Sequence, residues 1–203
     1  HGRVLPTVFG LKLVRPDLTV IGKGGDGDAL AIGAGHFVNF PGWNIDVTYI
    51  VTNNEVYGLT KGQLSPTALP TLKTKVNPDG GYKDPVDPIA LAIASGWTFV
   101  ARTTNVGKVG ELNTRQLSME MVQKAIQHKG SSLVIFETEC PTYNKIKTAD
   151  WMREKITSGE MRLGIFHQVQ KPTLHEKLGV TEPLFPKDRI ETEWLENIMN
   201  SFA

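Results

Sequence analysis

The chain has 203 residues, with 22 Lys and Arg against 21 Asp and Glu, so its formal net charge is +1. This balance argues against broad attraction to nucleic acid or to an anionic membrane surface, and we expect neither as a partner. The composition, 40% hydrophobic and 21% charged, is typical of a folded α/β domain. No segment approaches the roughly 20 apolar residues of a membrane-spanning helix.

The chain has one cysteine, Cys140. An internal disulfide is therefore excluded, and so is a metal site built only from this chain's cysteines. Such sparse cysteine use fits a reducing compartment, and we expect a cytoplasmic protein. The sequence begins at His1, without a Met, inside what looks like structured sequence, so we expect that the N-terminal part of the protein is missing.

The first half of the chain alternates helices and strands. Apolar spacing predicts a helix over residues 5–13, and a short β-branched run predicts a buried strand over 18–22. Small and apolar residues predict a helix over 29–38, ended by the Pro-Gly pair at 41–42, and a second strand follows over 45–52. Strand, helix and strand at this spacing form a βαβ unit, which predicts a parallel sheet with a right-handed crossover.

The second half continues the pattern and then changes character. In chain order we expect a long functional loop over 60–88, a helix over 87–94, a strand over 97–101, a helical stripe over 117–126 that ends at Lys129-Gly130, and a strand over 132–137. Beyond Asn144 the chain is more charged, with helices expected near 150–156 and 191–202. We therefore predict an α/β domain over residues 1–144, a parallel sheet flanked by helices, followed by a C-terminal arm over 145–203 that packs on this core or on a partner subunit.

A glycine-rich turn, residues 24–28 with the sequence Gly-Gly-Asp-Gly-Asp, follows the first predicted strand. Such a turn offers backbone N–H groups at the carboxyl edge of a parallel sheet, where phosphates bind. The same residues also suit a purely structural turn, in which Asp-Gly pairs supply the left-handed geometry. The turn alone does not decide between these two interpretations.

The pair Asn53-Asn54 favours the ligand-binding interpretation. It follows the next strand, 28 positions after Asp26 in the case of Asn54. Neighbouring strand ends lie close together, so a carboxylate on one and an amide oxygen on the other can meet at one hard cation. Mg²⁺ prefers oxygen ligands and keeps phosphates among them, so Asp26, Asn54 and a backbone carbonyl could hold a diphosphate. This spacing is the pattern of thiamin diphosphate enzymes.

Longer segments resemble a particular family. They are His1-Gly2-Arg3, residues 24–29, residues 44–50, residues 53–67, and Cys140-Pro141-Thr142-Tyr143-Asn144. Together they resemble the β subunit of the 2-oxoacid:ferredoxin oxidoreductases, through nearly the whole chain and most strongly up to Thr67. The run from Tyr57 to Thr67 is specific, unlike a lone glycine-rich turn. The resemblance implies the thiamin diphosphate-binding fold.

The resemblance also implies roles for individual residues. Mg²⁺ would be bound by the side chains of Asp26 and Asn54 and by the backbone carbonyl of Val56. The thiamin diphosphate would be lined by a further set, namely His1, Gly25, Gly27, Asp28, Gly58, Leu59 and Thr60. Lys61 matches a family lysine near the substrate and the path of coenzyme A, although a solvated loop lysine is an equally acceptable interpretation.

Cys140 resembles the fourth thiolate ligand of the family's [4Fe–4S] cluster. A buried free cysteine at a strand end is the alternative. The other three cluster cysteines of the family lie before its His-Gly-Arg segment, where this chain begins, so the chain as given cannot complete a four-thiolate cluster by itself. Either those residues precede His1 in the full protein or the cluster has been lost.

The implied reaction is the oxidative decarboxylation of a 2-oxo acid to acyl-CoA. In the family, the cofactor ylid attacks the keto carbon, CO₂ leaves, electrons pass through the iron–sulfur cluster to ferredoxin, and coenzyme A takes the acyl group. The glutamate that activates the aminopyrimidine belongs to another subunit or domain of the family enzymes, so we expect an α partner and a shared active site.

Two alternatives stay open at this point. A non-oxidative thiamin diphosphate-dependent decarboxylase would keep the cofactor and lose the redox step. A non-catalytic, anion-binding assembly subunit would use the glycine-rich turn only as structure. Asn53-Asn54 and the run from Tyr57 to Thr67 weigh against the second alternative.

Overall fold

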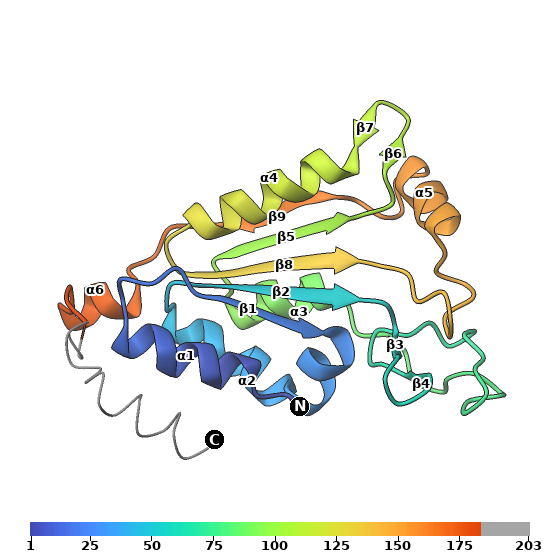
Figure 1. Ribbon diagram of the computed structural model, residues 1–203, viewed down its shortest axis with the longest axis horizontal. Helices are drawn as coiled ribbons and strands as arrows, with labels where there is room; N and C mark the ends of the chain where they lie inside the picture. Colours follow the sequence, from blue (N-terminus) through green and yellow to red (C-terminus); the bar gives the residue numbers. More distant parts are fainter. Residues whose placement is uncertain (184–203) are drawn as a thin grey trace, which may run out of the picture.

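The computed structural model describes residues 1–183. Its centre is a five-stranded sheet in the order β1-β2-β8-β5-β9 (Figure 1). The strands are β1 (Ile21–Gly25), β2 (Val47–Asn53), β5 (Phe99–Thr104), β8 (Ser131–Glu137) and β9 (Gly164–Gln168). The first four pair in parallel, and β9 joins β5 in the antiparallel sense, so the sheet is mixed but mostly parallel. The expected α/β fold is confirmed.

Helices cover both faces of this sheet. The helical segments are α1 (Val4–Val14), the π-helical turn η1 (Asp28–Ile32), α2 (Ala34–Asn39), the 3-10 turn η2 (Phe40–Trp43), α3 (Pro88–Ser95), α4 (Thr114–Gln127), α5 (Ala149–Thr157) and α6 (Leu174–Leu178). One core cluster joins α1, α2 and α3 to side chains of β2 and β8 such as Val51 and Leu133, whereas a second joins α4 to the opposite face through Val134. The alternation of Leu133 and Val134 follows the period of two expected of a strand buried on both faces.

The parallel strands all point towards the same end of the molecule. That end carries the short hairpins β3 (Val56–Tyr57) with β4 (Gln63–Leu64) and β6 (Lys108–Val109) with β7 (Leu112–Asn113), together with α5, while α6 lies at the opposite end (Figure 1). In open parallel sheets, ligands bind outside the carboxyl ends of the strands. The hairpin β3–β4 is therefore in the position where a site is expected.

Most predicted elements are confirmed to within two or three residues. The predicted helix over 87–94 begins after the N-cap Asp87, whose carboxylate accepts hydrogen bonds from the N–H groups of Ile89 and Ala90. The long segment over 60–88 has no regular element besides β4 until α3 begins at Pro88. The predicted helix over 191–202 lies outside the described residues.

The first strand is displaced from its prediction, which placed it over 18–22. It runs from Ile21 to Gly25, because it contains Gly22 and Gly24, which permit close packing, in place of apolar residues that fill a core. A Cβ on Gly22 would lie 2.9 Å from a methyl of Val4, and one on Gly24 would lie 2.6 Å from the hydroxyl of Tyr49. Hydrophobic patterning cannot detect a strand selected for such close approach.

The prediction of a single helix over 29–38 is wrong. The helix is interrupted at Gly33, which separates η1 from α2, and the helical segment then continues through η2 to Trp43. Gly2 packs against the backbone of this break, and a Cβ on Gly33 would meet the carbonyl oxygen of Asp28 at 2.6 Å. The Pro-Gly pair does not end the helical path. Asn44, in the left-handed conformation at φ 49°, ends it instead.

The segment predicted as a C-terminal arm contributes to the main sheet. Its described part contains α5, the antiparallel edge strand β9 and the capped helix α6. The division at residues 144 and 145 stays a prediction. Within residues 1–183, no helix is both long and apolar enough to cross a membrane.

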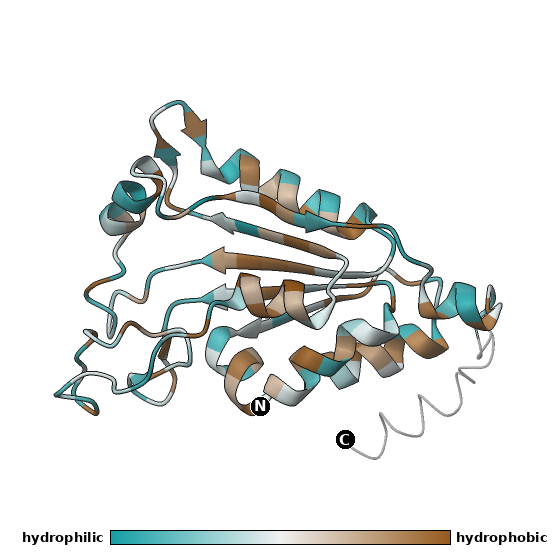
Figure 2. Cartoon of the chain, turned by 180° about the vertical axis from the view of Figure 1, so that it is seen from behind, coloured by the Kyte–Doolittle hydropathy of each residue, from teal (hydrophilic) through white to brown (hydrophobic). Residues whose placement is uncertain are grey.

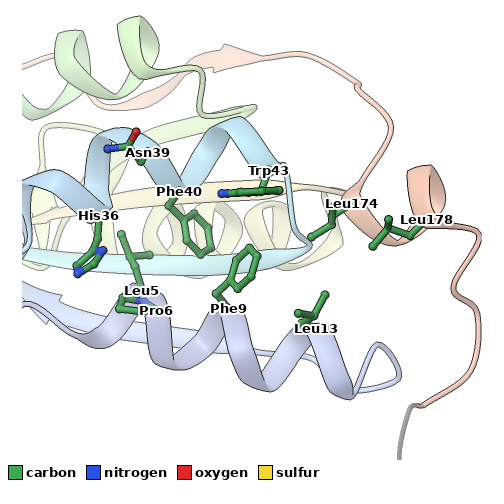
Figure 3. Close-up of a pocket in the computed structure, with 10 residues that line it drawn as sticks. All are labelled: Leu5, Pro6, Phe9, Leu13, His36, Asn39, Phe40, Trp43, Leu174 and Leu178. Carbon is green, nitrogen blue, oxygen red and sulfur yellow. The ribbon is translucent and has the colours of Figure 1, made fainter.

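An apolar groove of about 480 Å³ lies between α1, η2 and α6. Phe9 of α1 packs edge-on against Phe40 and Trp43, with ring centroids 6.1 and 5.9 Å apart, and Leu174 and Leu178 close one end of the groove (Figure 3). The hydropathy colouring in Figure 2 shows brown segments on the helices of this region as well as in the strands. The groove includes none of the predicted cofactor-binding residues.

The aromatic centre of the core is the fully buried Trp97. Its ring lies 5.4 Å from Phe37, 5.5 Å from Phe40 and 6.2 Å from Tyr49, and its indole N–H donates to the carbonyl of Phe37. Trp97→Ala should lower the free energy of unfolding by about 3–5 kcal/mol, because it leaves a large cavity between these rings. Urea unfolding followed by circular dichroism would measure this loss.

The control is Trp43→Ala, in a side chain that is 56% exposed. It should cost less than about 1 kcal/mol. Equal losses in the two variants would contradict the central role given to Trp97.

Candidate functional site

The site is at the carboxyl ends of β1 and β2. The two strands pair in parallel with Gly25 opposite Thr52, so Asp26 and Asn53-Asn54 leave the sheet side by side. The sequence prediction that these strand ends meet is borne out by this register. The hairpin β3–β4 continues directly from Asn54 and folds back towards Asp26.

Asp26 is almost completely buried, with 2% of its surface exposed. Its Oδ2 atom accepts three hydrogen bonds, from the backbone N–H of Glu55 at 3.0 Å and from the hydroxyls of Ser65 at 2.5 Å and Thr67 at 2.8 Å. Among residues 1–183, Oδ1 has no hydrogen-bond donor. This oxygen is thus available to a ligand, while the other fixes the carboxylate in place.

The segment from Asn54 to Val56 forms a tight turn beside Asp26. The side-chain oxygen of Asn54 accepts from the N–H of Val56 at 3.1 Å, and Glu55 between them has φ +67°. The Ser65 N–H donates to the carbonyl of Glu55, so these two residues form a hydrogen-bonded pair of the antiparallel ladder. Hydrogen-bonded and non-hydrogen-bonded pairs alternate along such a ladder, so the next pair, Val56 opposite Leu64, is a non-hydrogen-bonded pair. The carbonyl of Val56 therefore faces away from β4.

The predicted magnesium ligands are thus all near one strand edge and are all oxygens. Asp26 Oδ1, Asn54 Oδ1 and the Val56 carbonyl form a donor set that suits a hard cation that also binds phosphate. In the described part of the chain, no three His, Cys, Asp or Glu side chains gather into a group that could hold a metal ion by themselves. The residues present fit magnesium with a diphosphate.

The glycines of the turn have different surroundings. A Cβ on Gly25 would meet no atom within 4 Å, whereas one on Gly27 would overlap the ring of Tyr57. The hydroxyl of Tyr57 donates to the carbonyl of Gly27 at 3.2 Å, which joins the turn to β3. Partial burial raises the pKa of Tyr57, and the charges of Asp26 and Asp28 add to this shift. The tyrosine thus remains a neutral donor, and the space beside Gly25 is open to a ligand.

Asp28 connects the start of the chain to the turn. Its Oδ1 atom accepts from the backbone N–H of Gly2 at 2.5 Å, which places the neighbouring His1 at the same edge. Burial raises the pKa of the nearby Tyr49, and the charge of Asp28 adds to this shift. The helix expected to begin at the turn is only the five-residue η1, so no long helix N-terminus supports the phosphate prediction.

The residues from Gly58 to Lys61 form an exposed turn between β3 and β4. Leu59 is 91% exposed, and the Thr60 hydroxyl donates to the side-chain oxygen of Gln63 at 2.6 Å. Lys61, at φ +77°, lines a groove of about 830 Å³ with Tyr143 and other residues, among them Lys73, Lys75 and Lys145. No hydrogen bond within residues 1–183 joins this turn to Asp26, so its cofactor contacts stay a prediction.

Cys140 is half-buried and lies on the apolar cluster formed by Val56, Ala68 and Leu72. Its carbonyl accepts the N–H of Asn144, which closes the turn after β8. The thiol therefore lies on the same small core as Val56, whose carbonyl is one of the predicted magnesium ligands. The structure brings Cys140 to the site region, and its role as a cluster ligand stays a prediction.

The chain is similar to known proteins in sequence and in fold. Residues 1–136 match the family described as thiamine pyrophosphate enzyme, C-terminal TPP binding domain. The 2-oxoglutarate synthase subunit KorB of Methanocaldococcus jannaschii is 34% identical, over 88% of this chain and 71% of that relative. The 2-oxoacid:ferredoxin oxidoreductase subunit beta of Saccharolobus solfataricus is 47% identical over 77% of this chain and 49% of that relative.

This chain belongs to the 2-oxoacid:ferredoxin oxidoreductase β-subunit family. A solved 2-oxoglutarate:ferredoxin oxidoreductase from Magnetococcus marinus, with 2-oxoglutarate, coenzyme A and succinyl-CoA bound, superposes with a TM-score of 0.78 and 29% identity over 98% of this chain and 73% of that one. The chain spans about half the length of the first curated relatives that it matches. The expected family and fold are confirmed.

Several residues of this β-subunit site were missed by sequence reasoning. Ser65 and Thr67 hold Asp26, and their place inside the matched run up to Thr67 was the available signal. Lys147 lies with Glu55 and Glu137 in a buried ion cluster next to the site, and no pattern in the sequence indicated it. Burial lowers the pKa of Lys147, but the charges of Glu137 and Glu55 outweigh this effect and the net shift is upward, so the ammonium remains charged.

The two turn glycines provide a matched pair of substitutions. Gly27→Ala should lower the free energy of unfolding by about 1–3 kcal/mol, because the added methyl displaces the Tyr57 ring. Gly25→Ala should change it by less than about 1 kcal/mol, because its methyl enters open space without backbone strain. Urea unfolding of both variants without added ligands is the measurement. A Gly25→Ala loss as large as that of Gly27→Ala would contradict the open space.

Proposed function

We propose that the chain is the thiamin diphosphate-binding β subunit of a 2-oxoacid:ferredoxin oxidoreductase that converts a 2-oxo acid to acyl-CoA. The observation that carries this proposal is the oxygen donor set of Asp26, Asn54 and Val56 at the strand edge, in a chain of this family. The solved neighbour with 2-oxoglutarate and coenzyme A bound supports the substrate class. Which 2-oxo acid this chain uses depends in part on a partner's residues.

The chain's own residues would bind and orient the cofactor. Asp26, held at Oδ2, would offer Oδ1 to Mg²⁺, and Asn54 and the Val56 carbonyl would add two further oxygen ligands. The open space beside Gly25 would admit the diphosphate against the backbone. Gly27, Asp28, Gly58, Leu59 and Thr60 would line the rest of it, and the Asp28 contact to Gly2 would keep His1 nearby. The bound cofactor supplies the carbanion chemistry that decarboxylation needs.

The redox part of the proposal rests on Cys140. We propose that its thiolate is one of four ligands to a [4Fe–4S] cluster, with the other three supplied from outside residues 1–203. The cluster would supply the electron-transfer chemistry towards ferredoxin, and Lys61 would act on substrate or coenzyme A in the groove beside Tyr143. An α subunit or domain would complete the active site and provide the proton transfer to the aminopyrimidine. We place this enzyme in the cytoplasm.

The deciding experiment uses the full-length chain co-expressed with its partner under strict anaerobiosis. Coenzyme A-dependent reduction of a viologen dye is measured across a panel of 2-oxo acids. Reduction is the expected result, and it also identifies the substrate. Release of CO₂ without dye reduction would instead favour the non-oxidative decarboxylase and a lost cluster.

Asp26→Ala should abolish Mg²⁺-dependent retention of thiamin diphosphate, because it removes the carboxylate and leaves Ser65, Thr67 and the Glu55 N–H without their acceptor. Retention is measured by equilibrium dialysis of the assembled protein at several Mg²⁺ concentrations. Retention equal to that of the parent would show that the assigned metal site is wrong.

Gly25→Ala should weaken cofactor binding while leaving the fold intact, because its methyl would occupy space that the diphosphate needs. We expect at least a tenfold higher dissociation constant for thiamin diphosphate, measured by titration calorimetry at saturating Mg²⁺. Gly35→Ala is the control, since its Cβ also meets open space but lies in α2, away from the strand ends. Unchanged binding by Gly25→Ala would place the diphosphate elsewhere.

A further inference from the structure

A buried ion cluster lies directly behind the proposed magnesium site. Lys147 is 1% exposed, and its Nζ atom lies 2.6 Å from Glu137 Oε2, 3.1 Å from Glu55 Oε1 and 2.9 Å from the carbonyl oxygen of Asn53. Arg102 faces the other oxygen of Glu137 at 3.2 Å. The charges of Lys147 and Arg102 balance those of Glu55 and Glu137, and Arg102 also lies 3.8 Å from the more exposed Asp87.

The cluster joins a rigid element to the ligand turn. Glu137 is the last residue of β8, in the centre of the sheet, whereas Glu55 lies in the turn between Asn54 and Val56. The two carboxylates would repel each other without the ammonium that they share. Lys147 therefore fixes the position of Glu55 relative to the end of β8.

The position of Glu55 in turn determines the position of the proposed ligands. Its backbone N–H donates to Asp26 Oδ2, and its neighbours on either side are Asn54 and Val56. Its φ of +67° lies in the left-handed region, which a residue other than glycine adopts only when its surroundings hold it there. The ion pair to Lys147 is one such restraint.

A second link comes from the same segment. The Asn144 side-chain N–H group donates to the carbonyl of Asn54 at 3.1 Å and to Glu55 Oε2 at 3.3 Å. Its oxygen accepts the N–H groups of Ile146 and Lys147. The stretch that begins at Cys140 is therefore joined to the ligand turn at two points, by Asn144 and by Lys147.

We propose that Lys147 is a positioning residue that holds the turn from Asn54 to Val56 in the geometry that binds Mg²⁺ and the diphosphate. This inference rests on the proposed function. It assigns Lys147 no contact with substrate or cofactor, and it gives residues beyond the predicted site a role in metal affinity. Partners that orient metal ligands commonly change metal affinity by about 10–100-fold when they are removed.

The test is a charge-balanced double variant, Lys147→Met with Glu55→Gln, in the assembled protein with its partner. The change removes one positive and one negative charge and leaves the Arg102 pair with Glu137 in place. Mg²⁺ is titrated by calorimetry in the presence of saturating thiamin diphosphate. We expect the dissociation constant for Mg²⁺ to rise about tenfold or more, and excess Mg²⁺ to restore dye reduction to the parent's kcat.

The matched control is Lys124→Met with Glu120→Gln, which removes an exposed ion pair of 2.6 Å on α4. It should leave Mg²⁺ affinity unchanged. Glu55→Gln alone, which keeps Lys147 paired with Glu137, provides a second measurement if the double variant does not fold, and it should also weaken Mg²⁺ binding.

The outcomes separate this inference from the proposed function. Suppose that the parent binds Mg²⁺ and thiamin diphosphate, and that the folded double variant binds Mg²⁺ with the parent's dissociation constant. Lys147 is then only structural and the inference is wrong. If the double variant does not fold, the same result for Glu55→Gln leads to the same conclusion. Lost activity that excess Mg²⁺ does not restore would also overturn it. If the parent itself retains no thiamin diphosphate, the proposed function fails first.

Discussion

The candidate site depends on one buried carboxylate. Asp26 Oδ2 collects donors from the Glu55 backbone and from the hydroxyls of Ser65 and Thr67, which lie 29, 39 and 41 positions away in the sequence. These hydrogen bonds bring together the end of β1, the turn after β2 and the residues that follow β4. A buried charge is costly unless its hydrogen bonds are made, so the folding of the hairpin β3–β4 and the burial of Asp26 require each other.

The same carboxylate explains why the site suits a cation. Its three donors are neutral, and among residues 1–183 no basic side chain forms an ion pair with it. Behind it, by contrast, the charges of Glu55 and Glu137 are matched by Lys147 and Arg102. The compensated cluster and the uncompensated carboxylate are joined by Asn53, whose side-chain N–H donates to Glu137 and whose side-chain oxygen lies 2.7 Å from the Thr67 hydroxyl. The residual negative charge is thus concentrated at the strand edge, where Mg²⁺ would balance it.

Sequence reasoning succeeded where a local pattern carries the structure. Buried strands such as β2 and β8 are rich in apolar and β-branched residues, and Asp26 and Asn54 follow strand ends that a parallel sheet must bring together. It failed where packing between distant segments determines the local structure. The start of β1 and the break at Gly33 depend on close approach of Val4, Tyr49 and Gly2, and Lys147 reaches a carbonyl 94 positions away. No spacing rule within one sequence encodes such contacts.

The structure separates the residues that stabilise the fold from those that would perform chemistry, and it joins the two at one point. The aromatic centre around Trp97 and the apolar groove beside α1 share no residue with the ligand turn. Cys140, however, packs on the small cluster that contains Val56, and the residues that follow it hold Asn54 and Glu55 through Asn144 and Lys147. A displacement of the Cys140 segment would therefore also shift Asn54 and Val56. If Cys140 binds a cluster, assembly of that cluster and the affinity for Mg²⁺ should be linked, because both depend on the position of these eight residues from 140 to 147.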